Sequence, residues 1–339
     1  MSDPAPKPSK PFGTEFSENM ATAYFKNGEW SSAEIGPVQN LSLHPASHVL
    51  HYGSECFEGM KAYRTKESGA QIFRLEKHAA RMKRSTELLF LPFPGETFLK
   101  KIVCDLVAEN RESIPDAPGT LYIRPAIIGT EANIGAAGTG SSEACFFMLT
   151  SPVGAYFSGD KALRILIKEN GMRAVPGFGS AKTGGNYAAA LRQVIGARTE
   201  YQADQVLFCP GGDVQETGAS NFMLLNDEEL ITKPLNDTFL HGVTRDSVLT
   251  LAKSLGYRVT ERDFHADEII SWIADGGEAA LSGTAAVLAG VGTFIRNGKE
   301  FYAGGEGGAV GKNTKRIREA LTAIQVGEAE DQFGWLTVV

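Results

Sequence analysis

Lys182 is the residue whose surroundings point most directly to chemistry. It is the only charged residue between Arg173 and Arg192, and four glycines lie between positions 177 and 186. Glycine-rich backbone allows another molecule to approach closely, and burial among small and apolar groups favours the neutral form of a lysine amine. A neutral amine can attack a carbonyl carbon and form a Schiff base. The alternative is an ordinary surface lysine on a glycine-rich loop.

Two other segments have the composition of anion-binding turns. Gly242-Val-Thr-Arg-Asp246 lies where a helix is expected to begin, so its free backbone N–H groups and the helix dipole would attract a phosphate. Ser282-Gly-Thr-Ala285 is a second turn of small residues with the same property. Taken alone, each segment is more often an ordinary turn, and both interpretations stay open.

Arg81 and Glu216 are the remaining candidates. Arg81 lies beside the apolar stripe of an expected helix, where an arginine is more often part of a solvated face than a ligand. Glu216 follows a short strand and the Pro210-Gly-Gly212 turn, and a simple turn residue would fit there. A carboxylate in that place could also keep a ring nitrogen protonated, as a cofactor that stores electrons requires.

The elements that must position these residues are a mixture of helices and strands. Hydrophobic periodicity predicts helices at residues 76–89, 98–110, 188–201, 243–255, 267–274 and 314–326. It predicts strands at 21–25, 120–128, 144–149, 163–168, 205–209, 221–225, 230–233 and 257–260, and a strand, a turn and a helix within 278–289. In the 188–201 helix, Leu191, Val194 and Ile195 are expected to face inward. The lack of strict strand–helix alternation favours an α+β fold over a Rossmann sheet.

The 339 residues are enough for two domains. The segment from Ser151-Pro152 to Asp160 has the composition of a linker. We therefore expect a small N-terminal α+β domain at residues 1–153, an interdomain linker at 154–160 and a large C-terminal domain at 161–339.

Composition argues against several classes of protein. Apolar residues make up 42% and charged residues 22% of the chain, as in soluble globular proteins, and the net charge of −7 argues against a nucleic-acid surface. The four cysteines form no CxxC pair, so we expect reduced thiols and no metal site. No apolar stretch could span a membrane, and no secretory signal precedes residue 12. These features favour a cytoplasmic location.

Several short motifs follow one another along the chain. They are Leu50-His-Tyr-Gly-Ser-Glu-Cys-Phe-Glu-Gly-Met-Lys61, Phe73-Arg74 with Arg81-Met82, Leu121-Tyr-Ile-Arg-Pro125, Pro152-Val-Gly-Ala-Tyr156, Lys182-Thr-Gly-Gly-Asn-Tyr187, Glu216-x-Gly-x-x-Asn-Phe222, Gly242-Val-Thr-Arg245 and Ser282-Gly-Thr284. In this order and spacing they resemble the branched-chain amino acid aminotransferases, and the likeness extends from about Phe12 to the C-terminus. These are pyridoxal 5′-phosphate (PLP) enzymes of fold type IV, with a two-domain α+β fold like that of D-amino acid aminotransferase and the cofactor between the domains.

The resemblance implies a set of cofactor-binding residues. Lys182 would carry PLP as a Schiff base and move the proton of the substrate Cα. Glu216 would pair with the pyridine nitrogen, and Tyr187 would hydrogen-bond the phenolic oxygen. The phosphate would be held by Arg81, the backbone amides of Val243 and Thr244, and Thr284.

The resemblance also implies a substrate site for leucine, isoleucine and valine, with 2-oxoglutarate as the amino-group acceptor in a ping-pong reaction. The α-carboxylate would meet Tyr122 and the backbone of Thr284 and Ala285. Arg124 would meet the distal carboxylate of glutamate or 2-oxoglutarate. Phe12, Tyr52 and Phe57 would line the pocket for aliphatic side chains.

The resemblance further implies a homodimer or larger assembly, because Tyr52 and the loop near Ala136 would reach the neighbouring subunit's site. Other fold type IV activities remain alternatives: a D-amino acid transaminase, an (R)-amine transaminase or an aminodeoxychorismate lyase. The pair Tyr122-x-Arg124 favours the branched-chain enzyme. A catalytically silent PLP-binding or phosphate-binding protein is the alternative from another class.

Overall fold

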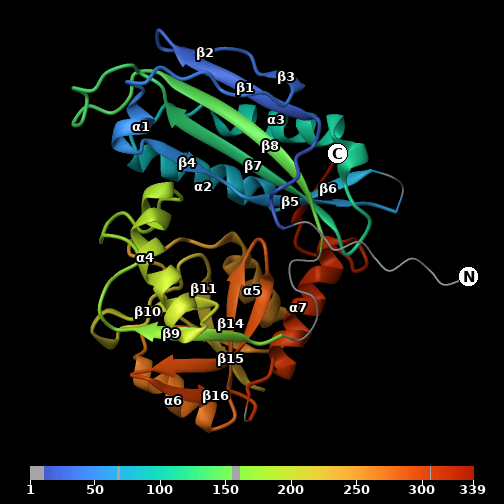
Figure 1. The fold of residues 1–339 in the computed structure, drawn as a ribbon. Coiled ribbons are helices and arrows are strands. Elements are labelled where there is room, and N and C mark those ends of the chain that lie inside the picture. Colours follow the sequence, from blue (N-terminus) through green and yellow to red (C-terminus); the bar gives the residue numbers. More distant parts are fainter. Residues whose placement is uncertain (1–10, 67–68, 155–160, 306) are drawn as a thin grey trace, which may run out of the picture.

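The computed structural model describes residues 11–66, 69–154, 161–305 and 307–339. Two sheets, one above the other in Figure 1, make up most of the molecule. This mixture of helices and largely antiparallel sheets confirms the α+β prediction. Most of the predicted linker lies outside the described residues. No described helix combines the length and the apolar character that a bilayer crossing needs.

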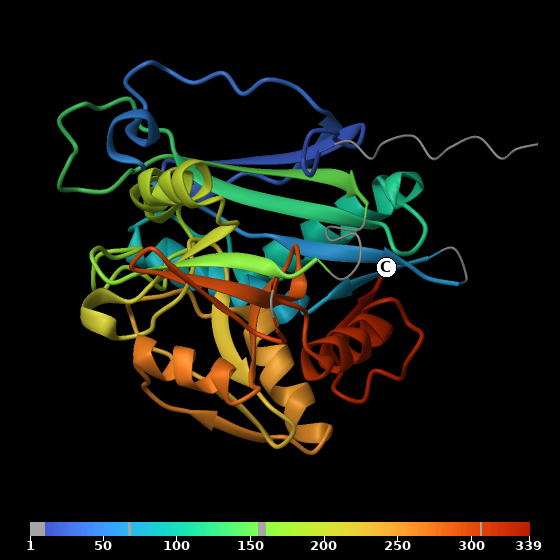
Figure 2. The same cartoon turned by 60° about the horizontal axis from the view of Figure 1, so that its bottom comes forward.

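The first sheet comes from the N-terminal half of the chain, with one exception. Its strand order is β17-β6-β5-β7-β8-β1-β2, and all its pairs are antiparallel. The exception is β17, from the last residues of the chain, which pairs with the edge strand β6; Figure 2 shows the C-terminus beside this edge. The strands are β1 (Asn19–Lys26), β2 (Glu29–Trp30), β3 (Glu34–Pro37), β4 (Glu55–Phe57), β5 (Met60–Arg64), β6 (Ala70–Phe73), β7 (Thr120–Gly129), β8 (Ala144–Val153) and β17 (Leu336–Val338).

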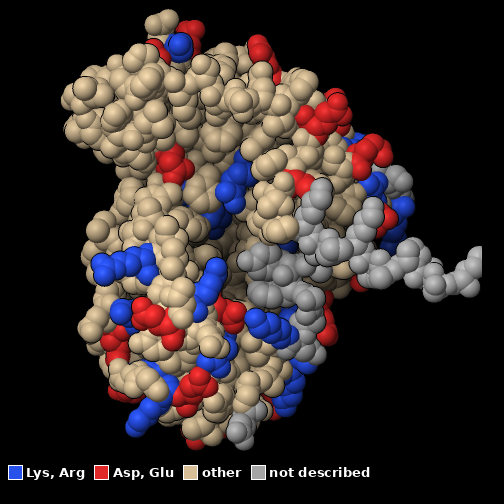
Figure 3. Space-filling model, viewed as in Figure 1, with Lys and Arg blue, Asp and Glu red and all other residues tan. Residues whose placement is uncertain are grey.

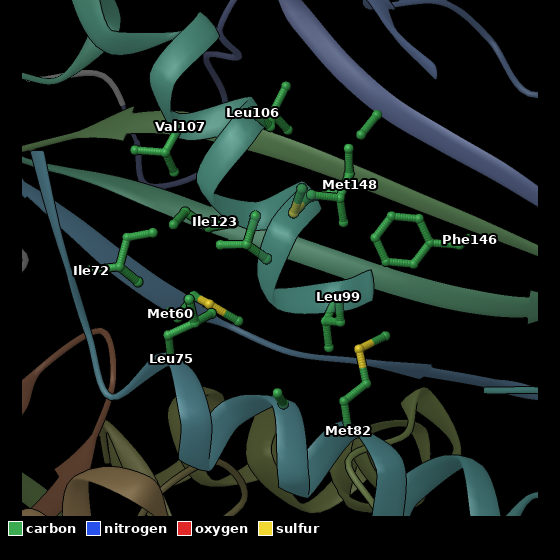
Figure 4. Packing of buried hydrophobic residues seen from close by; sticks show 14 of the residues in the cluster. Met60, Ile72, Leu75, Met82, Leu99, Leu106, Val107, Ile123, Phe146 and Met148 are labelled. Carbon is green, nitrogen blue, oxygen red and sulfur yellow. The ribbon is translucent and has the colours of Figure 1, made fainter. Parts of the chain in front are cut away.

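Two helices cover one face of this sheet. They are α2 (Leu75–Leu88) and α3 (Glu96–Glu109), and Figure 4 shows their apolar side chains meeting those of the strands in one core. Met60 of β5 belongs to this core and is fully buried. Because side chains alternate along a strand, the neighbours of Met60 are directed to the opposite face, toward the second sheet. The short elements α1 (His48–Tyr52) and η1 (Arg111–Ser113) complete this half.

The second sheet has the order β10-β9-β15-β14-β11-β12-β13, with β16 on β15. Pairs β9–β10, β9–β15 and β12–β13 are parallel, and the others are antiparallel. The strands are β9 (Leu163–Lys168), β10 (Gln205–Phe208), β11 (Asn221–Leu225), β12 (Glu229–Thr232), β13 (Arg258–Glu261), β14 (Glu278–Gly283), β15 (Val287–Arg296) and β16 (Lys299–Tyr302). The helices are α4 (Gly184–Tyr201), α5 (Val243–Ser254), α6 (Ala266–Ala274) and α7 (Lys312–Gln325), and η2 (Pro210–Gly212) is a single 3-10 turn.

Two details of the prediction are wrong. Residues 278–289 form a strand, a turn and a second strand, because β15 is buried along its length and a short buried strand cannot be told from a buried helix by periodicity. Leu191 and Ile195 of α4 are exposed at 54% and 52%, while Ala190 and Ala197 are buried. Helix α4 therefore packs through its alanines and presents an apolar face to solvent in the single chain.

Candidate active site

A cavity of about 320 Å³ lies where the two sheets face each other. Figure 3 shows basic atoms in the hollow between the two halves of the molecule. With the exception of Tyr52, every site residue predicted from the sequence lines this cavity: Phe12, Phe57, Arg81, Tyr122, Arg124, Lys182, Tyr187, Glu216, Val243, Thr244, Thr284 and Ala285. Tyr52 is 38% exposed at a separate place, where its hydroxyl donates to the Ile134 carbonyl.

Lys182 lies in the cavity, just before helix α4. Its Nζ is 2.7 Å from the hydroxyl of Tyr187, on the first turn of that helix. Its backbone is fixed on both sides, because Lys182 N donates to Ser85 Oγ (3.0 Å) and Phe57 N donates to Lys182 O (3.0 Å). Burial opposes ionisation of the Tyr187 phenol, but Lys182, Arg173 and Arg81 together outweigh this and lower its pKa. The pair can therefore share a proton.

Glu216 is buried and lines the same cavity. Its Oε1 is 2.6 Å from Arg173 Nη1 and accepts the Leu240 N–H at 2.9 Å, while its Oε2 accepts from Asn221 Nδ2 at 2.9 Å. Complete burial raises the pKa of Glu216 to about 7, and Arg173 acts in the opposite direction. A carboxylate held this firmly can face a protonated ring nitrogen.

Arg81 is held by an ion pair that the sequence did not reveal. Its Nε and Nη2 donate to the two oxygens of Glu58 at 2.6 and 2.8 Å, and His78 Nδ1 is 2.7 Å from the same carboxylate. Burial would raise the pKa of Glu58, but Arg81 and His78 hold it far below its usual range. Arg81 Nη1 donates to the His241 carbonyl at 3.1 Å. Of the five N–H donors of the guanidinium, two remain for a ligand.

Helix α5 begins beside Arg81. Its N-cap is Gly242, directly after His241, and no side chain caps it. The first N–H groups of the helix are therefore without intrahelical partners, and they favour an anion. A Cβ at position 242 would lie 2.0 Å from Asn221 Oδ1, so only glycine fits there. Arg81 from the first half and α5 from the second half therefore direct N–H donors that can bind an anion toward the cavity.

A further part of the cavity lining combines aromatic side chains with one arginine. Tyr122 and Arg124 are neighbours on one face of β7, and Arg124 Nη2 donates to the Tyr122 hydroxyl at 3.0 Å. The Arg124 guanidinium lies over the Phe57 ring at 4.7 Å. Phe12 packs edge-on against Tyr122, with 4.9 Å between ring centroids. This wall can receive an aliphatic side chain or a carboxylate.

Four functional or supporting residues were not assigned a role from the sequence: Glu58, Lys61, His78 and Arg173. Glu58 and Lys61 lie in the motif at residues 50–61, and the available signal was a charged residue within an otherwise apolar segment. His78 and Arg173 gave no such signal, because a lone histidine on a helix and a lone arginine on a loop are common on protein surfaces. Their partners are 20 or more residues away along the chain.

Comparison with known proteins agrees with this geometry. The family model described as amino-transferase class IV matches residues 55–293. The chain belongs to the class IV aminotransferases. It is similar to a probable branched-chain-amino-acid aminotransferase of Streptomyces coelicolor, with 39% identity over 340 residues that cover 96% of this chain and 91% of the relative.

Two solved structures of branched-chain amino acid aminotransferases share the fold of this class IV aminotransferase. The Escherichia coli enzyme is 27% identical with a TM-score of 0.74, and the match covers 93% of this chain and 98% of that one. The T.th. enzyme, complexed with N-(5′-phosphopyridoxyl)-L-glutamate, is 26% identical with a TM-score of 0.75, and the match covers 93% of this chain and 97% of that one.

Proposed function

We propose that the protein is a PLP-dependent aminotransferase that exchanges amino groups between leucine, isoleucine or valine and 2-oxoglutarate. The observation that carries the proposal is the contact between Lys182 Nζ and Tyr187, inside a cavity that is also lined by Arg81, the start of α5 and Glu216. The similar Streptomyces protein and the enzyme solved with a phosphopyridoxyl-glutamate support the choice of substrates.

The residues present fit PLP. The start of α5 and the two remaining donors of Arg81 suit a phosphate, and Glu216 suits a pyridine nitrogen. Lys182 would hold the cofactor covalently through its amine, with Tyr187 beside its phenolic oxygen and Thr284 near its phosphate. Glycine at 242 keeps the approach to α5 open, since a side chain there would collide with Asn221.

When bound, PLP would supply the electron sink that stabilises negative charge at the substrate Cα. The protein's own contribution is orientation and proton transfer. Lys182 Nζ would take the Cα proton and return it, and Tyr187, 2.7 Å away, would adjust the charge of that amine. Glu216, kept in place by Arg173, would hold the ring nitrogen protonated.

A single pocket would serve both kinds of substrate. Tyr122 with the turn at Thr284 and Ala285 would receive the α-carboxylate, and Phe12 and Phe57 would contact an aliphatic side chain. Arg124 would pair with the distal carboxylate of 2-oxoglutarate. With leucine bound, Arg124 would retain the Phe57 ring, 4.7 Å from its guanidinium in the structure, as a partner.

The proposal includes a division into domains at residues 153 and 161, a homodimer or larger assembly, and a cytoplasmic location. The two sheets support the division, although β17 from the C-terminus joins the first sheet. The exposed apolar residues Leu191 and Ile195 of α4, and Tyr52 outside the cavity of its own chain, suit an assembly in which subunits cover them.

Borohydride reduction of the PLP-loaded protein, followed by peptide mapping, tests the proposal. The label is expected on Lys182, and Lys182→Ala is expected to lose transamination of L-leucine while Lys253→Ala, at an exposed position of α5, retains it. A label on another lysine, or turnover by Lys182→Ala, would refute the mechanism. Greater activity with D-alanine or (R)-1-phenylethylamine than with L-leucine would assign the chain to another fold type IV activity.

A further inference from the structure

Lys61 of β5 is a buried cation that the proposed mechanism does not use. Only 8% of it is exposed, and its Nζ donates to the Ala285 carbonyl at 2.9 Å. No acidic side chain of the described residues pairs with it. Burying an ammonium group without a negative partner is costly, so a purely structural role would be served better by an apolar side chain of similar length.

The position of Lys61 connects the two walls of the substrate site. In the β5–β7 pair Lys61 lies directly opposite Tyr122, so both side chains stand on the same face of the sheet. Ala285, its hydrogen-bond partner, belongs to the β14–β15 turn, and Thr284 and Ala285 line the cavity together with Tyr122. Lys61 therefore reaches from the first sheet to a turn of the second, behind the proposed α-carboxylate site.

The β14–β15 turn needs such an anchor. It has three residues, 284–286, and is followed by Val287 with a φ of 60°. A β-branched residue in the left-handed region is strained, and such a conformation persists only where its surroundings hold it. Since a peptide unit is planar, a hydrogen bond to the Ala285 carbonyl fixes the orientation of the whole Ala285–Ala286 peptide.

We propose that Lys61 is a positioning residue for the substrate α-carboxylate, which it serves in two ways. It holds the turn at Ala285 in the binding conformation, and its positive charge faces the carboxylate from behind that turn. The inference rests on the proposed function only in naming the carboxylate as that of an amino acid or 2-oxo acid. The missing negative partner of Lys61 is then the substrate itself.

The test uses the PLP-loaded variants Lys61→Met and Lys61→Arg, with Lys253→Met as the matched control on an exposed site. The probes are 4-methylvalerate, a leucine analogue with a carboxylate and no amine, and its neutral amide, each titrated by the change in cofactor absorbance. Lys61→Met is expected to raise the Kd of the carboxylate about tenfold, as the loss of one charge-assisted contact predicts, and that of the amide less than threefold. Lys61→Arg is expected to restore carboxylate binding, and KM for L-leucine is expected to rise more than kcat falls.

Three results would overturn the proposal. If Lys61→Met bound the carboxylate as tightly as the wild type does, the charge of Lys61 would have no role in carboxylate binding. If the Kd values of the acid and the amide rose equally, Lys61 would have a structural role only. A lowered melting temperature in Lys61→Met, with no recovery in Lys61→Arg, would also indicate a structural role only. The titration is independent of turnover, so failure of the protein to transaminate L-leucine would refute the proposed function and still leave this result readable.

Discussion

Replacing Gly59 by alanine would test directly how the substrate site is built. A Cβ at this position would lie 1.9 Å from the Tyr122 hydroxyl and 2.8 Å from its Cζ, whereas ordinary contact begins at 3.4 Å. The hydroxyl must therefore move by about 1.5 Å, the difference between 3.4 and 1.9 Å. Tyr122 has little room to retreat, because it is 8% exposed and Phe12 packs against its ring.

The expected cost of Gly59→Ala is about 1–3 kcal/mol of stability, as for other overpacked sites. A shift of about 1 Å in a positioning group can reduce catalysis about 10²-fold, so we expect kcat/KM for L-leucine to fall between tenfold and a hundredfold. The assay pairs this rate with the melting temperature and with the Kd for PLP. The Kd should change little, because Tyr122 is not among the residues proposed to hold the cofactor.

Gly36→Ala in β3 is the matched control for this change. Position 36 has no neighbouring heavy atom within 4 Å of a built Cβ, and like Gly59 it does not have a positive φ. The control should keep both activity and melting temperature. If Gly59→Ala behaved like Gly36→Ala, the close approach of Tyr122 to β5 would be wrong, and with it the position of the α-carboxylate site.

Three further predictions follow from the charged groups. Glu58→Gln leaves the buried Arg81 without its carboxylate, so the free energy of unfolding should fall by about 3–5 kcal/mol at pH 7. Because the pKa of Glu58 is lowered by Arg81 and His78, this deficit should stay constant above pH ~4 and shrink below it. Urea titrations at several pH values measure it. Burial lowers the pKa of Lys61 to about 8, so the unfolded chain binds more protons between pH 8 and ~10.5 and wild-type stability should rise across that interval. Lys61→Met should therefore be more stable than the wild type at pH 7, by at most about 3 kcal/mol in free energy of unfolding, and this advantage should vanish near pH ~10.5. A difference between the two proteins that stayed constant with pH would show that Lys61 does not titrate in this interval. Arg124→Ala should raise KM for 2-oxoglutarate at least about tenfold and that for L-leucine less than threefold, and equal increases would contradict its proposed role.

The parts of this molecule that local sequence determines were predictable. All six predicted helices exist, and the start of α5 at Val243 agrees to the residue, because Gly242 and the following apolar stripe are local signals. Helix α4 begins at Gly184, four residues before its predicted start, since the glycines that suggested a loop form its first turn. Its exposed Leu191 and Ile195 could not be predicted, because which face of a helix is covered depends on what packs against it.

Site residues could be predicted where a short sequence motif surrounds them. For Lys182, Glu216 and the start of α5, the neighbouring residues in the sequence indicated the possible chemistry. The ion pairs Glu58–Arg81 and Arg173–Glu216 did not, because each joins residues 23 or more positions apart and needs the fold to bring them together. Sequence therefore indicated which groups line the cavity, and only the structure showed what holds those groups in place.

The charge balance of the cavity connects these supporting residues to substrate choice. Glu58 pairs with Arg81, and Glu216 pairs with Arg173. In the part of the chain that the structure describes, Lys61 and Arg124 have no carboxylate within 4 Å. Each therefore needs a negative partner or a substitute.

Arg124 is half-buried and lies over the Phe57 ring at 4.7 Å, whereas Lys61 is buried and, among the described residues, donates to the Ala285 carbonyl. Because water can solvate the half-buried cation but not the buried one, Lys61 should demand a carboxylate from every substrate, and Arg124 should tolerate its absence. Every amino acid and 2-oxo acid carries the α-carboxylate that Lys61 would face. Only glutamate and 2-oxoglutarate carry the second carboxylate that Arg124 would bind, so this difference between two cations allows one pocket to accept both kinds of substrate.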